Sequence, residues 1–356
     1  MKALILIIIS FNLFAFKSTT PAKARLMGDA FSSLATGPFA VLYNPALLGR
    51  HSGFSFYPIN TTLVIPNALA KADDFNNLSS DPQEIFDLVS DFPLRVGYNF
   101  SPGFQLGGFA LTAIVDNDAT IKIQNQVNPV LDLNYRDDRG FIMGYGYKIA
   151  QNLNFGASLK YIKRESIDQN FALTSTTILD VLDGGDLNQI LNSLGRVKSQ
   201  GFSMDFGLDY INQTGSTTFM SGLVVKDLYN TIEPDEGHED LNPIEQKMSV
   251  NLSSAVRLNL AGAFGLTLST ELKNLEDTRR SFLNRLHFGG ELSFTPALSL
   301  LAGYNDHALS YGGRLNLSLV DFYVGIVEEQ QGKRIDQGNS SGIVLYLSLL
   351  DFKFEP

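Results

Sequence analysis

Histidine, cysteine and clustered carboxylates are the side chains whose spacing could mark a catalytic or metal site. The chain has 356 residues and no Cys, which excludes disulfides, thiolate metal sites and cysteine nucleophiles. No two histidines have the spacing of an HxxxH or HExxH metal motif, and there is no Gly-x-Ser-x-Gly segment. The four histidines are His51, His238, His287 and His307. We therefore expect no enzyme activity, no catalytic residue, no metal and no cofactor.

The densest group of carboxylates lies in residues 233–240, where five Asp and Glu residues occupy eight positions. Calcium binds several carboxylate oxygens, but this spacing does not match the EF-hand loop, and we interpret the segment as a solvated acidic loop. The whole chain carries 27 basic and 37 acidic residues, a net charge of −10. A nucleic-acid binder needs a basic face, so the composition argues against nucleic-acid binding.

The first 24 residues have the pattern of a secretory signal peptide. Met1 and Lys2 precede an apolar run over residues 3–16, which is too short for a membrane-spanning helix of roughly 20 residues. Ala22-Lys23-Ala24 has the small-x-small form of a cleavage site, and a cut nearer residues 18–20 is an alternative. An uncleaved anchor helix is a second alternative. No later segment is long and apolar enough to span a bilayer as a helix, so the mature chain can cross a membrane only as a closed β-barrel.

Most of the remaining chain alternates between apolar and polar residues with a period of two, the pattern of β-strands. The clearest segments are 141–149, 153–161, 202–210 and 248–260. In the first, the apolar set is Phe141, Met143, Tyr145, Tyr147 and Ile149. Shorter segments bring the total to between 14 and 16 strands. Most are seven to eleven residues long, and a tilted strand needs roughly 9–11 residues to cross a bilayer.

The second face of each strand distinguishes a membrane barrel from a soluble sheet. It holds mostly Gly, Ser, Asn, Thr and single charges, and Tyr and Phe stand at the ends of the apolar faces, as in the aromatic girdles of membrane barrels. Short turns are expected at 101–103, 150–152, 261–264 and 295–297, and long connections at 59–93, 116–140, 163–201 and 227–247. We predict an all-β fold: one antiparallel transmembrane barrel of about 14 strands over residues 51–356. A soluble periplasmic β protein is the weaker alternative.

Two of the long connections contain helical patterns. Asp81-Pro82-Gln83-Glu84 is typical of a helix start, and apolar residues at helical spacing precede Gly195. The apolar sides of these short helices could contact an apolar ligand at the barrel mouth, and packing on the barrel rim is the plainer alternative. The candidate contact residues are Ile85, Phe86, Leu88, Val89, Leu187, Ile190, Leu191 and Leu194.

Residues 25–50 do not alternate, and their many small side chains allow them to pack inside another structure. The segment contains Gly28-Asp29-Ala30-Phe31 and then Tyr43-Asn44-Pro45-Ala46, in which Asn before Pro favours a turn. It resembles the start of FadL-like outer-membrane proteins, where a Gly-Ala-Phe segment and an Asn-Pro-Ala turn form an N-terminal plug. Residues 285–291, 300–305 and 311–314 resemble the strands of the PorV-like and TraF-like branches of that superfamily.

The resemblance implies a plug over residues 25–50 inside a 14-stranded barrel in the outer membrane of a Gram-negative bacterium. Residues 28–31 and 43–46 would form the gate. The implied function is passage of small hydrophobic molecules, such as fatty acids, which leave sideways through the barrel wall. The alternative is a PorV-like or TraF-like barrel that binds secreted or envelope proteins and transports nothing. The expected partners are outer-membrane lipid and either a hydrophobic ligand or a protein.

The lumen face is also expected to carry charged residues, because charges cost little there and are penalised on the lipid face. Their expected role is to pair with one another and with the plug. This set comprises Arg95, Lys148, Lys160, Asp205, Asp209, Arg257, Glu271, Glu291 and Arg314.

Overall fold

The computed structural model describes residues 21–66, 94–124, 130–172, 191–235, 244, 246–260, 263–330 and 339–354. The helical elements are α2 (Ala22–Leu26), η1 (Gly37–Phe39), α3 (Ala40–Tyr43), η2 (Pro45–Arg50) and α8 (Phe282–Arg285). The strands of the first half are β1 (Phe54–Tyr57), β2 (Ile59–Pro66), β3 (Leu94–Phe100), β4 (Gly103–Leu106), β5 (Phe109–Gln124), β6 (Val130–Ala150) and β7 (Leu153–Ala172). Those of the second half are β8 (Val197–Thr214), β9 (Thr217–Asn230), β10 (Glu233–Pro234), β11 (Ser249–Asn259), β12 (Gly265–Leu272), β13 (Leu286–Ser293), β14 (Leu298–Asn305), β15 (Ala308–Asn316), β16 (Val320–Gln330), β17 (Asn339–Leu349) and β18 (Phe352–Phe354).

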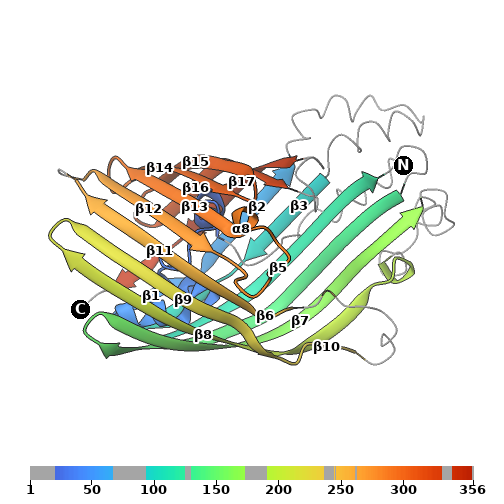
Figure 1. The fold of residues 1–356 in the computed structure, drawn as a ribbon, viewed down its shortest axis with the longest axis horizontal. Helices are drawn as coiled ribbons and strands as arrows, with labels where there is room; N and C mark the ends of the chain where they lie inside the picture. The colour runs from blue at the N-terminus through green and yellow to red at the C-terminus, as the bar shows by residue number, and fades with distance from the viewer. Residues whose placement is uncertain are drawn as a thin grey trace.

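Fourteen of these strands close into an antiparallel barrel, which confirms the predicted fold class (Figure 1). The order around the wall is β2-β3-β5-β6-β7-β8-β9-β11-β12-β13-β14-β15-β16-β17, and β17 pairs with β2 to close the ring. The short strands β1, β4 and β18 pair with one another beside β2, β3 and β17, and they lengthen the wall at one end. Each strand of this ring pairs with another strand on both sides, so the ring has no unpaired strand edge.

The predicted turn at residues 101–103 is wrong: the chain there is a break inside one strand of the wall. β3 and β4 keep a single register on β5, with Phe100 opposite Val115 and Gly103 opposite Thr112. Pro102 has no N–H to give to the ladder, but its carbonyl accepts a 2.9 Å bond from the Ala113 N–H, so pairing resumes. The hairpin turn comes at Gly107-Gly108 instead, where Gly107 has a φ of +54°.

Two of the predicted long connections, 116–140 and 163–201, contain extensions of strands: β5 and β6 run through residues 116–124 and 130–140, and β7 and β8 run through residues 163–172 and 197–201. β5, β6, β7 and β8 have 16, 21, 20 and 18 residues, and they form a tall side of the barrel (Figure 1). In these extensions polar residues occupy both faces of the wall, for example Asp138 toward the lumen and Arg139 outward. The apolar–polar alternation that predicts strands is therefore lost although the backbone ladder continues.

The outward face of the wall is apolar. On β6 a Cβ at Gly144 or Gly146 would touch the segment inside the barrel, so the alternate residues, among them Tyr145 and Tyr147, face outward. Those two side chains are 57% and 58% exposed. Within the parts of the chain that the structure describes, no helix is long and apolar enough to cross a membrane.

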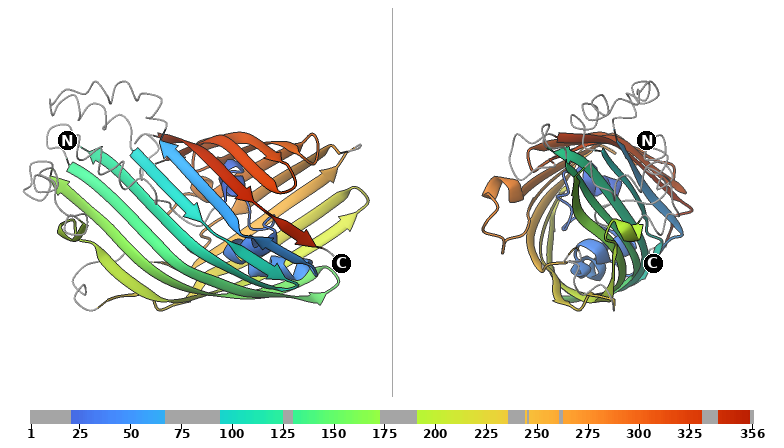
Figure 2. Two further views of the ribbon diagram at one scale, coloured as in Figure 1. Left: turned by 180° about the vertical axis from the view of Figure 1, so that it is seen from behind. Right: turned by 90° about the vertical axis from the view of Figure 1, so that its right-hand side faces the viewer.

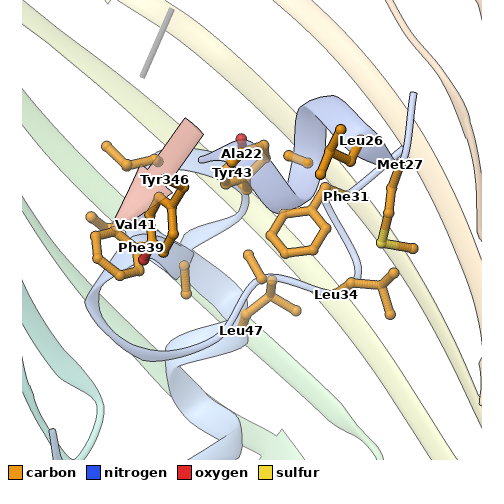
Figure 3. Close-up of a cluster of buried hydrophobic side chains, with 14 of the residues drawn as sticks. Ala22, Leu26, Met27, Phe31, Leu34, Phe39, Val41, Tyr43, Leu47 and Tyr346 are labelled. Atoms are coloured by element: carbon orange, nitrogen blue, oxygen red, sulfur yellow. The ribbon is translucent and has the colours of Figure 1, made fainter. Parts of the chain in front are cut away.

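The core lies inside the barrel and is supplied by the N-terminal segment. Residues 22–50, with α2, η1, α3 and η2, fill the lumen, as the end-on view of Figure 2 shows. Leu26, Met27, Leu47 and Leu48 are among its fully buried side chains. Wall residues such as Tyr346 of β17 complete the cluster (Figure 3). We call residues 22–50 the plug.

Candidate functional site

Glycines on the lumen face of the wall make room for the plug. A Cβ on Gly156 of β7 would overlap the backbone of Pro45 and Ala46, and one on Gly146 of β6 would lie 2.5 Å from the Gly49 nitrogen. Real Cβ atoms do not approach so closely, so larger residues at these positions would exclude the plug. The wall glycines that face the plug include Gly144, Gly146, Gly156, Gly207, Gly222, Gly289, Gly303, Gly312 and Gly325.

The first predicted gate segment, residues 28–31, lies against β12 and β13. Gly28 has a φ of +60°, and a Cβ there would lie 2.5 Å from the Phe288 carbonyl oxygen. The buried carboxylate of Glu271 accepts three hydrogen bonds from the plug: from the Phe31 and Ser32 N–H groups at 2.9 Å each and from the Ser32 hydroxyl at 2.6 Å. The Gly28 carbonyl accepts a 2.8 Å bond from His287 Nδ1. This segment is therefore fastened to the wall at several atoms.

Two ion pairs join charged plug residues to the wall beside this segment. The Lys23 ammonium lies 2.6 Å from Glu291, and burial lowers the pKa of Lys23, with Glu291 opposing that shift. Asp29 pairs with Lys273. Burial alone would raise the pKa of Asp29, but Lys273 and His287 outweigh it and hold that pKa below its usual value. Asp29 is thus ionised at neutral pH and keeps its tie to the wall.

The second predicted gate segment, residues 43–46, is held through Asn44. Its side-chain oxygen accepts a 3.1 Å bond from the Ala46 N–H and so caps η2, while its amide donates a 3.0 Å bond to the Leu208 carbonyl of β8. The side chain is fully buried. The Asn-Pro turn predicted from the sequence is therefore also a tie between plug and wall.

The end of the plug is fixed by a paired arginine. Arg50 donates two hydrogen bonds to Asp209 of β8, at 2.8 and 2.5 Å, and Asn154 of β7 donates a third at 2.9 Å. Bidentate arginine–carboxylate pairs combine charge with a fixed geometry. Together with the Lys23–Glu291 pair and the bonds to Glu271, this pair holds the plug at both of its ends and in the middle.

A cavity of about 310 Å³ lies between the plug and the tall side of the wall. One part of its lining is apolar and includes Leu42, Ile114, Ile142 and Ile162. Most of the rest is charged: Asp29, Asp116, Arg136, Asp138, Lys160, Arg164, Lys226, Asp227, Lys247 and Lys273. The cavity could therefore hold a small molecule with its apolar part against the isoleucines.

Most charges around this cavity are paired inside the wall. Arg164 contacts Asp138 at 2.6 Å, and Arg136 contacts Asp116 at 3.2 Å. Lys160 lies 2.7 Å from both Asp205 and Asp227. Across the described part of the chain, no group of three His, Asp or Glu side chains is placed to bind a metal ion.

The predicted site residues divide into two groups. All eight gate residues lie in the plug, and Gly28, Asp29, Tyr43 and Asn44 contact the wall or the cavity. Of the candidate ligand contacts, Leu191 and Leu194 are buried. The other six, Ile85, Phe86, Leu88, Val89, Leu187 and Ile190, fall outside the described residues.

Several of the charged side chains that were expected on the lumen face do bind the plug. Glu271, Glu291 and Asp209 all bind plug residues. Their plug partners Lys23, Ser32 and Arg50 were not expected, because nothing in their spacing marks them. The exposed Lys148 and Arg257 of the expected set make no ion pair with any residue that the structure describes.

Solved structures of hydrocarbon channels share this fold. The toluene transporter TodX of Pseudomonas putida matches with a TM-score of 0.51 and 14% identity, over 95% of this chain and 99% of TodX. Its deltaS2S3 mutant, a monoaromatic hydrocarbon channel, matches with a TM-score of 0.55 and 13% identity, over 95% and 100%. The toluene transporter TbuX of Ralstonia pickettii matches with a TM-score of 0.51 and 12% identity, over 97% and 99%.

The comparisons by sequence return nothing: no protein-family model and no curated protein matches the chain. The structural matches nevertheless extend over nearly the whole of each matched protein. They confirm the fold expected from the FadL-like resemblance, a 14-stranded antiparallel barrel.

Proposed function

We propose that this chain is an outer-membrane channel for selective passage of small hydrophobic molecules, with the plug as its gate. The observation that carries the proposal is the combination of an apolar outer wall with a lumen filled by residues 22–50. A barrel closed in this way is not a general diffusion pore, because the plug occupies its interior. The shared fold with toluene transporters supports the same function.

The membrane position follows from the wall. Lipid is the medium that covers a band of exposed aromatic and aliphatic side chains without cost, and barrels with such bands span outer membranes. We place the end with the short turns, such as Gly215-Ser216, on the periplasmic side and the extensions of β5–β8 on the outer side.

The polar ties of the plug suit a gate that rearranges. They are a limited number of hydrogen bonds and ion pairs around Glu271, Asn44 and Asp209, and the apolar strip of the cavity borders the plug residues Leu42 and Tyr43. A hydrophobic molecule in the cavity would contact Leu42 and Tyr43 and would compete with the contacts that these side chains make inside the barrel. In this proposal the molecule enters from the outer side, binds along Ile114, Ile142 and Ile162, and passes when the plug shifts.

A second candidate function is a barrel that binds secreted or envelope proteins and passes nothing. The observation in its favour is the charge of the cavity, where ten of the sixteen lining residues are Asp, Lys or Arg. So many charges suit a rigid, hydrated lumen better than a path for a neutral hydrocarbon. The two functions predict different bound species.

Native mass spectrometry of the protein, gently extracted from its own outer membrane, tests the proposal. We expect a bound small apolar molecule of defined mass on the wild type. The variant Ile162→Phe fills the apolar side of the cavity and should lose that mass. The matched variant Leu159→Phe adds the same ring on the outward face of β7 and should keep it.

An empty barrel with a stoichiometric protein partner would overturn the transport proposal and support the second function. Loss of the small molecule from both variants would assign it to the lipid-facing wall and would also contradict the proposal. Heat-modifiable migration on a gel confirms that each variant is folded.

A further inference from the structure

The apolar band on β6, β7 and β8 has a sharp upper limit. Five outward residues in succession are apolar on each strand, and the next outward residues are Arg139, Lys163 and Gln200. From Ile149 to Arg139 is ten residues, about 33 Å along the strand, or about 25 Å in height at the usual tilt of a barrel strand. That height matches the apolar belt of outer-membrane barrels. The cations thus stand where hydrocarbon gives way to headgroups.

An aromatic row marks the same limit directly below the cations. The rings of Phe141 and Tyr161 are 5.6 Å apart, and those of Tyr161 and Phe202 are 5.0 Å apart. These three residues are cross-strand neighbours, and so are Arg139 and Lys163 one step above them. Aromatic girdles lie at the interface between hydrocarbon and headgroups. The aromatic row therefore fixes the height of the cations independently of the strand count.

Four cations stand together above this row, and we call Arg139, Lys163, Arg196 and Lys198 the cationic ledge. The Arg139 side chain is 64% exposed and Lys198 is 43% exposed. Asp137 lies 2.7 Å from Arg139, and Glu165 lies 3.1 Å from Arg196 and 3.7 Å from Lys198. Lys163 is exposed and forms no ion pair with a described residue.

The ledge is a positive surface on a negative protein. Among the residues that the structure describes, the exposed cations Arg139, Lys163 and Lys198 and the buried, paired Arg196 face two carboxylates there, whereas the whole chain has a net charge of −10. A surface with equal numbers of cations and carboxylates would not need an anionic ligand. An excess of exposed cations at headgroup height, continuous with the lipid-facing wall, fits an anionic lipid whose acyl chains lie on the apolar band.

We propose that the cationic ledge binds the phosphate groups of a phosphorylated outer-leaflet lipid. Arg139 and Lys163 would contact a phosphate directly, and Lys198 would add charge from the neighbouring strand. The acyl chains would pack on the row formed by Phe141, Tyr161 and Phe202. This inference rests on the proposed outer-membrane position but not on the passage of any ligand.

Titration of the purified, lipid-stripped full chain with lipid A, followed by native mass spectrometry, tests the ledge. The double variant Arg139→Ala/Lys163→Ala should bind lipid A roughly 10- to 30-fold more weakly than the wild type, because each basic residue near an anionic lipid contributes about 1 kcal/mol. The charge-keeping variant Arg139→Lys/Lys163→Arg should retain binding. The matched control Lys148→Ala/Arg257→Ala removes two exposed cations at the other end of the wall and should bind as the wild type does.

Two further binding measurements identify the chemical group that the cationic ledge recognises. Lipid A without its phosphates should lose most of its affinity for the wild type, and raised salt should weaken the binding of intact lipid A. Equal binding of both lipid forms, or an unchanged affinity in Arg139→Ala/Lys163→Ala, would overturn the proposal. A barrel that binds lipid A at the ledge but carries no hydrophobic ligand would contradict the transport function alone.

Discussion

Glu271 is the residue on which the attachment of the plug depends most. Its buried carboxylate has three donors, all from Phe31 and Ser32, although these residues are 240 and 239 positions away in the chain. A carboxylate in this position satisfies two backbone N–H groups that would otherwise be buried without an acceptor. Its own charge is stabilised by the same bonds.

Replacing Glu271 with Ala should destabilise the folded barrel by about 3 kcal/mol, since it leaves the N–H groups of Phe31 and Ser32 without their acceptor. Urea unfolding in lipid vesicles measures this loss. Glu276→Ala removes an exposed carboxylate that accepts one bond from the Val250 N–H, and it should cost less than about 1 kcal/mol. Equal losses in both variants would show that Glu271 does not hold the plug.

The ion pair between Asp29 and Lys273 sets the pH below which the plug loses one of its ties to the wall. The pKa of Asp29 lies below the usual value of 3.8, so its tie to Lys273 contributes fully at neutral pH and is lost only as the pH falls through that lowered pKa. Channel conductance in planar bilayers should therefore stay low down to about pH 4 and rise below it. In Asp29→Asn this rise should disappear. A wild-type rise already at pH 6 would contradict the assignment.

The elements show which parts of the fold could be predicted. Strands within the membrane have one apolar and one polar face, so segments such as 141–149 and 153–161 were predicted correctly. Above the membrane both faces are polar, and the upper half of β6 was missed for that reason. The Asn44 turn was predicted from local chemistry, whereas the pairing of Glu271 with Ser32 depends on the closed barrel and leaves no local signal.

Wall glycines give a prediction at the level of strand and plug. Gly156→Val should push Pro45 and Ala46 away from β7 and open the lumen, so single-channel conductance should rise well above that of the wild type. The matched variant Gly290→Val adds the same side chain where the nearest atom is 3.6 Å from the new Cβ, and its conductance should not change. Closed channels in both variants would argue against the position of the plug.

Helix α2 gives a prediction about processing. Ala22 and Ala24 are fully buried, and Lys23 binds Glu291, so residues 22–24 act as part of the plug. We therefore propose the cut near residues 18–20 rather than the boundary after residue 24. Mass spectrometry of the mature N-terminal peptide should find a chain that begins at or before Pro21. A mature chain that begins at Arg25 would contradict this proposal.

The whole molecule combines an apolar exterior with a polar, filled interior. The apolar exterior suits a lipid environment, and in the proposed function the plug closes the barrel to ordinary solutes. The barrel followed from the amino-acid sequence, because the alternation of residues 141–161 is visible there. The charged cavity did not, because its lining comes from strands far apart in the chain, such as Lys160 and Lys273.

Selective passage through the plugged barrel is tested most directly by the entry of two solutes into cells that carry this protein in the outer membrane. One solute is radiolabelled toluene, and the other is a small hydrophilic antibiotic. We predict that the wild type accelerates toluene accumulation without admitting the antibiotic, while Gly156→Val admits both. Equal acceleration of both solutes by the wild type, or of neither, would contradict selective passage through a plugged barrel.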